Sequence, residues 1–223
     1  NRCKSKKTRE KNNKSFNNNS LKTFNSAFRH SQVTKLIDDS DTSLTSNITR
    51  VVLGKFFTPT LNESVGYTIS FNNVIFNPHA GHNTNEGGVI ASTGFKVSGD
   101  TVNEMFLDED GFGNIRRFYI LAGEKKYVDN TAGTVNYGNG ILSLNPLTIN
   151  QVSDVDNTSS TQIRITTIPD SVDIIPVRNQ LLEIDLVNTV VNVAIDRLGV
   201  GDINTVNTAD LATSSFTKTV SGY

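Results

Sequence analysis

The pattern of apolar and polar residues alternates with a period of two over most of the chain after residue 49, and this indicates half-buried β-strands. It is clearest at residues 66–76, where Tyr67, Ile69 and Phe71 share one face. The pattern predicts strands at residues 49–57, 66–76, 89–97, 103–107, 115–121, 125–128, 134–137, 141–147 and 161–168. Weaker β-like stretches follow at residues 179–185, 189–195 and 216–220.

Glycine, asparagine and aspartate cluster between these stretches, as they do in tight turns. The run from Asp110 to Asn114 predicts one hairpin, and Gly138-Asn139-Gly140 predicts a second. Pro146 lies inside the returning strand of the second hairpin, so we expect that strand to be an edge or to carry a bulge. Residues 77–88 form a long irregular loop, and loops of this length in compact domains are usually functional or mobile.

The best helix candidate is residues 25–39, where Asn25 or Ser26 can cap the start. One face of this helix would carry the apolar residues Phe28, Val33, Leu36 and Ile37. Three aspartates follow at 38, 39 and 41, and the helix dipole disfavours acidic residues at that end. We therefore expect the helix to stop by Ile37.

Charge is uneven along the 223 residues. Seven basic residues against Glu10 give the first 14 residues a net charge of +6, which leaves −7 for the rest of a chain whose net charge is −1. Residues 1–20 are also rich in asparagine and nearly devoid of apolar side chains, so we expect a disordered tail, extraneous to the protein proper. After this tail we predict a helical lead-in at 21–48, a β-domain at 49–150, a linker at 151–160 and a second β-rich region at 161–223.

The predicted fold class is mainly β, or α+β with a short N-terminal helix, arranged as antiparallel sandwich-like domains with long loops. Strand and turn signals recur at spacings of roughly 8 to 12 residues, as in sandwiches. The chain begins without a methionine and stops directly after an alternating run, so we expect it to be a piece of a longer protein.

Two patterns could bind a metal ion. His79-x-x-His82 could ligate a transition metal with Glu86 as a third donor, although a loop fixes no geometry and packing or hydrogen bonding explains the pair as well. Asp108 and Asp110 resemble part of a calcium loop, but the terminal glutamate is missing and a hairpin turn explains Asp110-Gly111 equally. We expect no metal site and no cofactor.

Catalytic patterns are absent from the sequence: it holds no nucleophile elbow, no P-loop and no complete dinucleotide-binding glycine motif. We therefore expect no enzymatic activity. Arg116 and Arg117 point to opposite faces of one strand, so one could pair with Asp108 or Asp110 while the other reaches a partner protein. Arg178 could pair within its domain or cross a subunit boundary.

Several long phrases resemble a known protein family in the family's own order. They are SAFRHSQVTKLIDDSDTSLTSN, YTISFNNVIFNPHAGHN, GGVIASTGFKVSG, FLDEDGFGNIRRFYI, GTVNYGNGILSL and IIPVRNQLLEID. Together they resemble the C-terminal half of the large baseplate wedge subunit of T-even-like contractile-tailed phages, a member of the wider baseplate J-like class, in the variants associated with marine cyanophages. The resemblance covers residues 26–195 and excludes residues 1–20.

This resemblance implies a structural virion protein of the tail baseplate that is assembled in the host cytoplasm. It implies a homodimer that contacts other wedge subunits and its own copies in the ring, without nucleic acid, membrane or small-molecule substrate. The residues that we expect at interfaces are Asn77, His79, His82, Arg116, Arg117 and Arg178. The alternative is a carbohydrate- or receptor-binding β-sandwich of a tail fibre, against which the lack of tryptophan counts. A third reading is a calcium-dependent adhesion domain built on Asp108 and Asp110.

Overall fold

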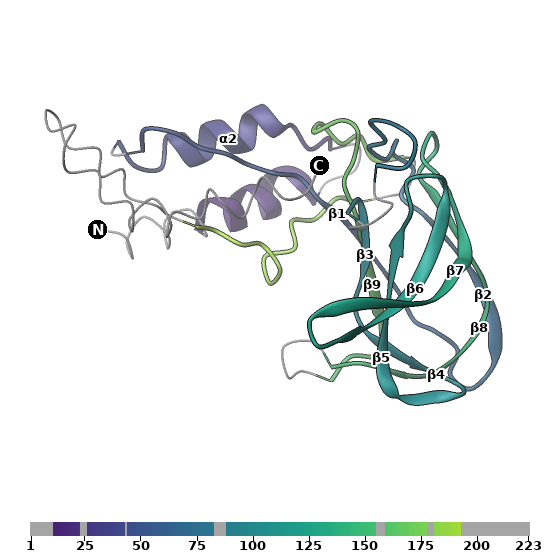
Figure 1. The fold of residues 1–223 in the computed structure, drawn as a ribbon. Helices are drawn as coiled ribbons and strands as arrows, with labels where there is room; N and C mark the ends of the chain where they lie inside the picture. Colours follow the sequence, from purple (N-terminus) through teal and green to yellow (C-terminus); the bar gives the residue numbers. More distant parts are fainter. Residues whose placement is uncertain are drawn as a thin grey trace, which may run out of the picture. The chain divides into compact units, whose positions relative to one another are not determined.

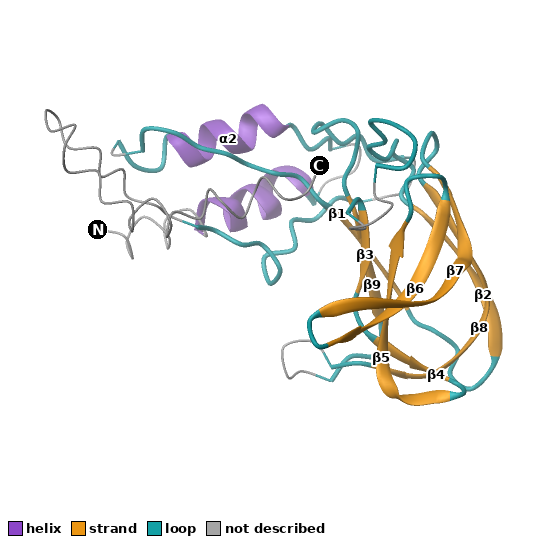
Figure 2. Ribbon diagram, in the orientation of Figure 1, coloured by secondary structure: helices purple, strands orange, loops and turns teal. Residues whose placement is uncertain are grey.

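A computed structural model describes residues 11–22, 26–42, 44–82, 88–154, 159–177 and 181–192 of the 223-residue chain. The chain divides into two compact units. Arg50–Val177 forms the first, a β-rich unit, and the described parts of Asn1–Thr49 and Arg178–Tyr223 form the second, a helical unit. Figure 2 shows the strands confined to the β-rich unit and the helices confined to the other.

All strand pairings in the β-rich unit are antiparallel. The strands are β1 (Leu53–Phe57), β2 (Ser64–Ser70), β3 (Ile90–Ser92), β4 (Phe95–Val97), β5 (Asp100–Glu109), β6 (Asn114–Leu121), β7 (Glu124–Asn136), β8 (Ile141–Val152) and β9 (Ile163–Thr167). They form a three-stranded sheet in the order β1-β9-β3 and a six-stranded sheet in the order β2-β8-β4-β5-β6-β7 (Figure 1). The mainly β, antiparallel fold class with a short helix is therefore confirmed.

The larger sheet closes on itself because β7 pairs with β8 as well as with β6. The pairings run from β8 through β4, β5, β6 and β7 back to β8, which makes the arrangement more like a barrel than the sandwich that we expected. Both sheets line one core. It contains Ile90, Ile163 and Ile165 from the smaller sheet together with Phe95, Leu107, Ile115 and Leu142 from the larger one. These aliphatic and aromatic side chains are the inward-facing members of the alternating pattern.

Both predicted hairpins are present, β5–β6 and β7–β8. Gly111 and Gly113 take positive φ values of 76° and 98° in the first turn, and Gly140 takes 65° in the second, a region that favours glycine. The register of β8 against β2 shifts by one residue between Leu147 and Leu144, next to Pro146. Since β8 is paired on both sides, the bulge that we predicted there is how this strand accommodates a proline.

Two parts of the predicted organisation differ from the structure. β9 pairs with β1 and β3, so it belongs to the same unit as the hairpins, and residues 151–160 do not separate two domains. Residues 181–192 form no strand, because the Asp185 carboxylate accepts hydrogen bonds from the backbone N–H groups of Val187 and Asn188 and holds a turn. The strand predicted at 216–220 lies outside the described residues.

The helical unit begins earlier than we expected. Residues 11–16 are α-helical and continue into a π-helical turn, η1 (Asn17–Leu21), so the predicted disorder does not extend through residue 20. Phe16 and Leu21 pack with Val33 of helix α2 (His30–Asp38) in a small core. Only two apolar side chains mark this turn in the sequence, and they fall within a polar, asparagine-rich tract whose composition indicates disorder.

Helix α2 starts after Arg29 rather than at the predicted caps, and it ends one residue beyond Ile37. Lys35 pairs with Asp39 one turn later, with Nζ 2.8 Å from Oδ2, and this pair partly offsets the unfavourable acidic end. Within the described residues, no helix is both long and apolar enough to span a bilayer.

Candidate functional site

The β5–β6 hairpin gathers most of the charged residues singled out in the sequence. Its turn is held by Asp110, whose Oδ1 accepts hydrogen bonds from the backbone N–H groups of Phe112 (2.8 Å) and Asn114 (3.0 Å). The Asn114 side-chain amide donates to Oδ2 at 2.7 Å. Burial acts to raise the pKa of Asp110, but these hydrogen bonds and the nearby Arg116 charge outweigh it and hold the pKa below its ordinary value. The carboxylate is thus engaged as a turn cap rather than open to a calcium ion.

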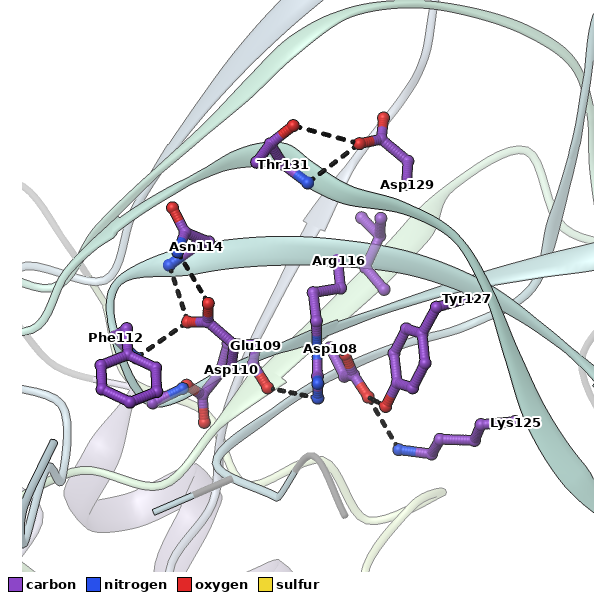
Figure 3. A network of polar contacts seen from close by, with 12 residues as sticks. Asp108, Glu109, Asp110, Phe112, Asn114, Arg116, Lys125, Tyr127, Asp129 and Thr131 are labelled. Atoms are coloured by element: carbon purple, nitrogen blue, oxygen red, sulfur yellow. Dashed lines mark hydrogen bonds and ion pairs between the residues drawn. The ribbon is translucent and has the colours of Figure 1, made fainter. Parts of the chain in front are cut away.

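Asp108 lies at the centre of a second set of contacts (Figure 3). The hairpin register places it directly opposite Arg116, whose Nε donates to Asp108 Oδ1 at 2.9 Å. Lys125 Nζ and the Tyr127 hydroxyl both donate to Oδ2 at 2.8 Å. Asp108 is 2% exposed and Arg116 is 5% exposed, so this is a buried charge network, and each charge in it has hydrogen-bonding partners.

Aromatic rings enclose this network. The Arg116 guanidinium lies 4.2 Å from the centre of the Tyr127 ring, and Lys125 Nζ lies 4.5 Å from the centre of the Phe118 ring. Burial, together with the hydrogen bond to Asp108, raises the pKa of the Tyr127 hydroxyl well above its ordinary value. The Tyr127 hydroxyl therefore stays protonated at neutral pH and donates to Asp108.

Strand β7 can cover Asp108 because its register against β6 shifts twice. Ile115 pairs with Gly133, Arg117 with Asp129, and Phe118 with Tyr127, so β7 contains extra residues at two places. Bulges of this kind bend a strand and increase its twist. The bend brings Lys125 and Tyr127, 17 and 19 residues from Asp108, onto the same carboxylate.

Glu109 points to the opposite face of β5 from Asp108 and is fully buried. Its Oε2 accepts hydrogen bonds from the Tyr137 hydroxyl at 2.6 Å and from the Gly111 backbone N–H. Its Oε1 faces Nε2 of His82 at 3.4 Å. Burial, together with the hydrogen bond to Glu109, raises the pKa of Tyr137, so this hydroxyl also remains a donor.

The segment 79–82 packs against the β5–β6 turn. The Gly81 N–H donates to the Gly111 carbonyl at 3.0 Å, and a Cβ at Gly111 would lie 2.6 Å from the His82 nitrogen. Gly111 is therefore needed for close approach as well as for its positive φ. The structure brings His82 and the Asp108–Asp110 corner together, although at least 25 residues separate them in the sequence.

In the part of the chain that the structure describes, the weak metal candidates His79, His82, Asp108 and Asp110 do not form a donor set. Among the described residues, no group of three or more histidine, cysteine, aspartate or glutamate side chains is placed to hold an ion. His79 is exposed, and the centres of the His79 and His82 rings lie 6.0 Å apart, with the ring planes nearly perpendicular. Glu86 lies outside the described residues.

The predicted interface residues fall into different environments. Asn77 and His79 are exposed, while His82 is mostly covered by the turn that it packs on. The Arg116 side chain is buried in its pair with Asp108, so it is the arginine that pairs across the hairpin rather than the one that reaches outward. The Arg117 side chain is 18% exposed and lies 3.9 Å from Asp129, and Arg178 lies outside the described residues.

Sequence reasoning missed four residues of this site: Lys125, Tyr127, Tyr137 and Phe112. The first three reach the acidic run only through the bend of β7 and the β7–β8 turn, so no local pattern marks them. Phe112 is an apolar residue in a predicted turn, and the sequence alone shows this mismatch between residue type and position. In the structure its side chain is 63% exposed.

A search of curated proteins found no match to this chain. A family model described as baseplate structural protein gp6, C-terminal domain III, matches residues 11–55, about a fifth of the chain. The match starts before residue 20, so part of the tail that we expected to be extraneous resembles this domain. It covers the described helices of the lead-in and ends inside β1. This match supports a structural role for the chain in the tail baseplate of a T-even-like phage.

Proposed function

We propose that the chain is a structural component of a phage tail baseplate wedge that mediates self-association and contacts between wedges. The observation that carries this proposal is the family match at residues 11–55. The resemblance of the long phrases between residues 26 and 195 extends the same reading into the β-rich unit. The partners would be a second copy of the chain and other wedge subunits, in the virion after assembly in the host cytoplasm.

The polar network supports a mechanical role rather than a chemical one. The carboxylates of Asp108 and Asp110 are occupied by internal donors, and Glu109 is fully buried. Groups held in this way rigidify a hairpin but are not open to a substrate. A module whose hairpins and loops are fixed in this manner loses little conformational entropy when it is clamped between neighbours.

The surface best suited to self-association is formed by Asn77, His79 and Phe112, which we call the corner surface. Its three residues are exposed, and their segments touch through the hydrogen bond between Gly81 and Gly111. Protein interfaces are enriched in aromatic residues surrounded by a polar rim, and a surface that combines Phe112 with the Asn77 amide and the His79 imidazole has that composition. A stable contact of this kind should bury roughly 1,200–2,000 Å² in total.

Light-scattering mass measurements on the full chain over a range of concentrations test self-association. We expect a dimer for the parent and a shift toward monomer for Phe112→Ser. Val102→Ser is the matched control, because Val102 is 84% exposed in the same unit but lies on β5 outside the corner surface. A parent that stays monomeric at every concentration, or a Val102→Ser variant that dissociates as much as Phe112→Ser, contradicts this part of the proposal.

The location in the virion has its own test. Gold-labelled antibodies raised against the chain should bind the distal end of the tail in electron micrographs of phage particles that encode it. Labelling of the head or the fibres alone would contradict a baseplate role, whatever the oligomeric state of the isolated chain.

A further inference from the structure

Two buried polar atoms face each other without a hydrogen-bond partner in the β-rich unit. They are Nε2 of His82 and Oε1 of Glu109, 3.4 Å apart, on side chains that are 6% and 0% exposed. Buried polar atoms in native proteins almost always have a partner, so such a pair requires an explanation. The position of hydrogen atoms on the two groups supplies one.

The other ring nitrogen of His82 determines its tautomer. Nδ1 lies 2.9 Å from the backbone carbonyl oxygen of His79, and a carbonyl oxygen can only accept. Nδ1 must therefore carry a hydrogen. A neutral imidazole has only one N–H, so in neutral His82 the Nε2 atom would present a lone pair to Glu109.

Glu109 is constrained in the same way. Its Oε2 already accepts from the Tyr137 hydroxyl and the Gly111 N–H, so both of those hydrogens point at Oε2. Oε1 of an ionised Glu109 then presents a lone pair to His82. Two opposed lone pairs in a buried site repel each other, and the contact becomes favourable only when one proton lies between them.

We propose that a single proton shared between His82 Nε2 and Glu109 Oε1 clasps the segment 79–82 to the β5–β6 turn, and that loss of this proton at raised pH releases the segment. The proton satisfies both buried atoms whether it lies nearer the imidazole or nearer the carboxylate. In either case the pair contributes no net charge when protonated and one negative charge when not.

The charges on this hairpin and on Lys125 beside it leave one negative charge when the shared proton is absent. Asp108, Glu109 and Asp110 contribute three negative charges, against two positive charges on Arg116 and Lys125. One further proton brings this cluster to neutrality. Arg116 pairs with Asp108 on the other face of β5, and its Nη2 donates to the backbone carbonyl of Glu109 at 2.8 Å.

The remaining neighbours of the pair do not supply the missing proton. The His79 ring is exposed and meets the His82 ring edge-on, with its Nδ1 3.2 Å from the carbonyl oxygen of Ala80. The Tyr137 ring lies 6.1 Å from the His82 ring and its hydroxyl is committed to Glu109. The proton must therefore come from solvent, which makes the clasp sensitive to pH.

The clasp fixes the position of His79 relative to Phe112 in the corner surface, because His79 lies on the clasped segment and Phe112 lies on the turn against which this segment packs. An effect of pH on self-association rests on the function proposed above. The clasp itself does not, since docking of the segment can be measured in a chain that remains monomeric.

Amide hydrogen exchange at Gly81 measures the clasp directly, because its N–H bonds to the Gly111 carbonyl across the contact. Protection factors, corrected for the intrinsic exchange rate, are compared at about pH 5.5 and about pH 8.5, which brackets most of the pH range in which histidine side chains in proteins commonly change charge. We expect Gly81 protection in the parent to fall by about tenfold at the higher pH, as loss of a buried hydrogen bond implies. The Ile75 amide, which bonds to the Tyr137 carbonyl at 2.8 Å, should keep its protection and serves as the internal control.

Glu109→Gln tests the proton itself. Tyr137 and Gly111 would still require an acceptor, so the glutamine oxygen takes the Oε2 position and its NH₂ group faces His82. This NH₂ donates to a neutral imidazole but opposes a protonated one, so the dependence of Gly81 protection on pH should reverse. His79→Gln is the matched control and should behave like the parent. Unchanged Gly81 protection in the parent, or the same direction of change in Glu109→Gln as in the parent, would overturn the proposal.

Discussion

Replacing Asp108 with asparagine removes one charge from the buried network while keeping the shape of the side chain. Asp108 is 2% exposed and accepts hydrogen bonds from Arg116, Lys125 and Tyr127. The substitution removes the carboxylate charge that the Arg116 Nε contacts at 2.9 Å, and the Arg116 residue is only 5% exposed. Lys125 is about one-third exposed and can turn toward water, so most of the cost falls on Arg116.

The expected magnitude follows from the burial of both partners. Removing one member of a buried ion pair typically costs about 3–5 kcal/mol. Asparagine can still accept a hydrogen bond, so we expect the free energy of unfolding to fall by about 3 kcal/mol, at the lower end of this range. Replacing Asp108 with leucine and Arg116 with methionine together should recover most of this loss, because no charge then remains buried without a partner.

Urea denaturation followed by tyrosine fluorescence measures the effect, since four of the five tyrosines lie in the β-rich unit and the chain has no tryptophan. Glu124→Gln, at the start of the neighbouring strand β7, is the control. Glu124 pairs with Lys126 at an exposed site, with 73% of its side chain accessible, and its loss should change the stability by less than about 1 kcal/mol. If Asp108→Asn costs no more than Glu124→Gln, the network does not hold the hairpin in the way described.

Two further predictions concern the β5–β6 turn. Gly111→Ala should destabilise the β-rich unit by more than Gly99→Ala, because both glycines have positive φ (76° and 89°) but only a Cβ at Gly111 meets backbone, 2.6 Å from the His82 nitrogen. Equal losses in urea denaturation would mean that segment 79–82 does not pack on the turn. Asp110 has a lowered pKa in the folded state, so its contribution to stability is present above its ordinary value of 3.8 and is lost as the pH falls through the folded value. Asp110→Asn should therefore reduce the loss of stability between about pH 5 and about pH 2, and an unchanged acid profile would contradict the turn-cap assignment.

Local features of the fold follow from the sequence. Alternation of apolar residues located most of the strand positions in the β-rich unit, and glycine with asparagine or aspartate identified both hairpin turns. Three boundaries were wrong: the strand predicted at 89–97 is two strands, β3 and β4, the strands predicted at 125–128 and 134–137 are both part of β7, and the strand predicted at 66–76 ends at Ser70. The register of β5 against β6 follows from the short turn between them, so the pairing of Asp108 or Asp110 with one of the two following arginines could be predicted, and the structure shows that the pair is Asp108 with Arg116. These features depend on residues that lie close together in the chain, where geometry leaves few alternatives.

Contacts between distant residues were decided only by the tertiary structure. β9 reaches β1 across more than 100 residues and makes one unit of what the sequence divides at 151–160. The contact between His82 and Glu109 depends on loop packing, which produces no periodic pattern in the sequence. The bend that places Lys125 and Tyr127 over Asp108 depends on bulges, which also produce none. The physical reason is that an alternating pattern specifies which face of a strand is buried. Which residues pack against that face depends on how the whole sheet closes around its core.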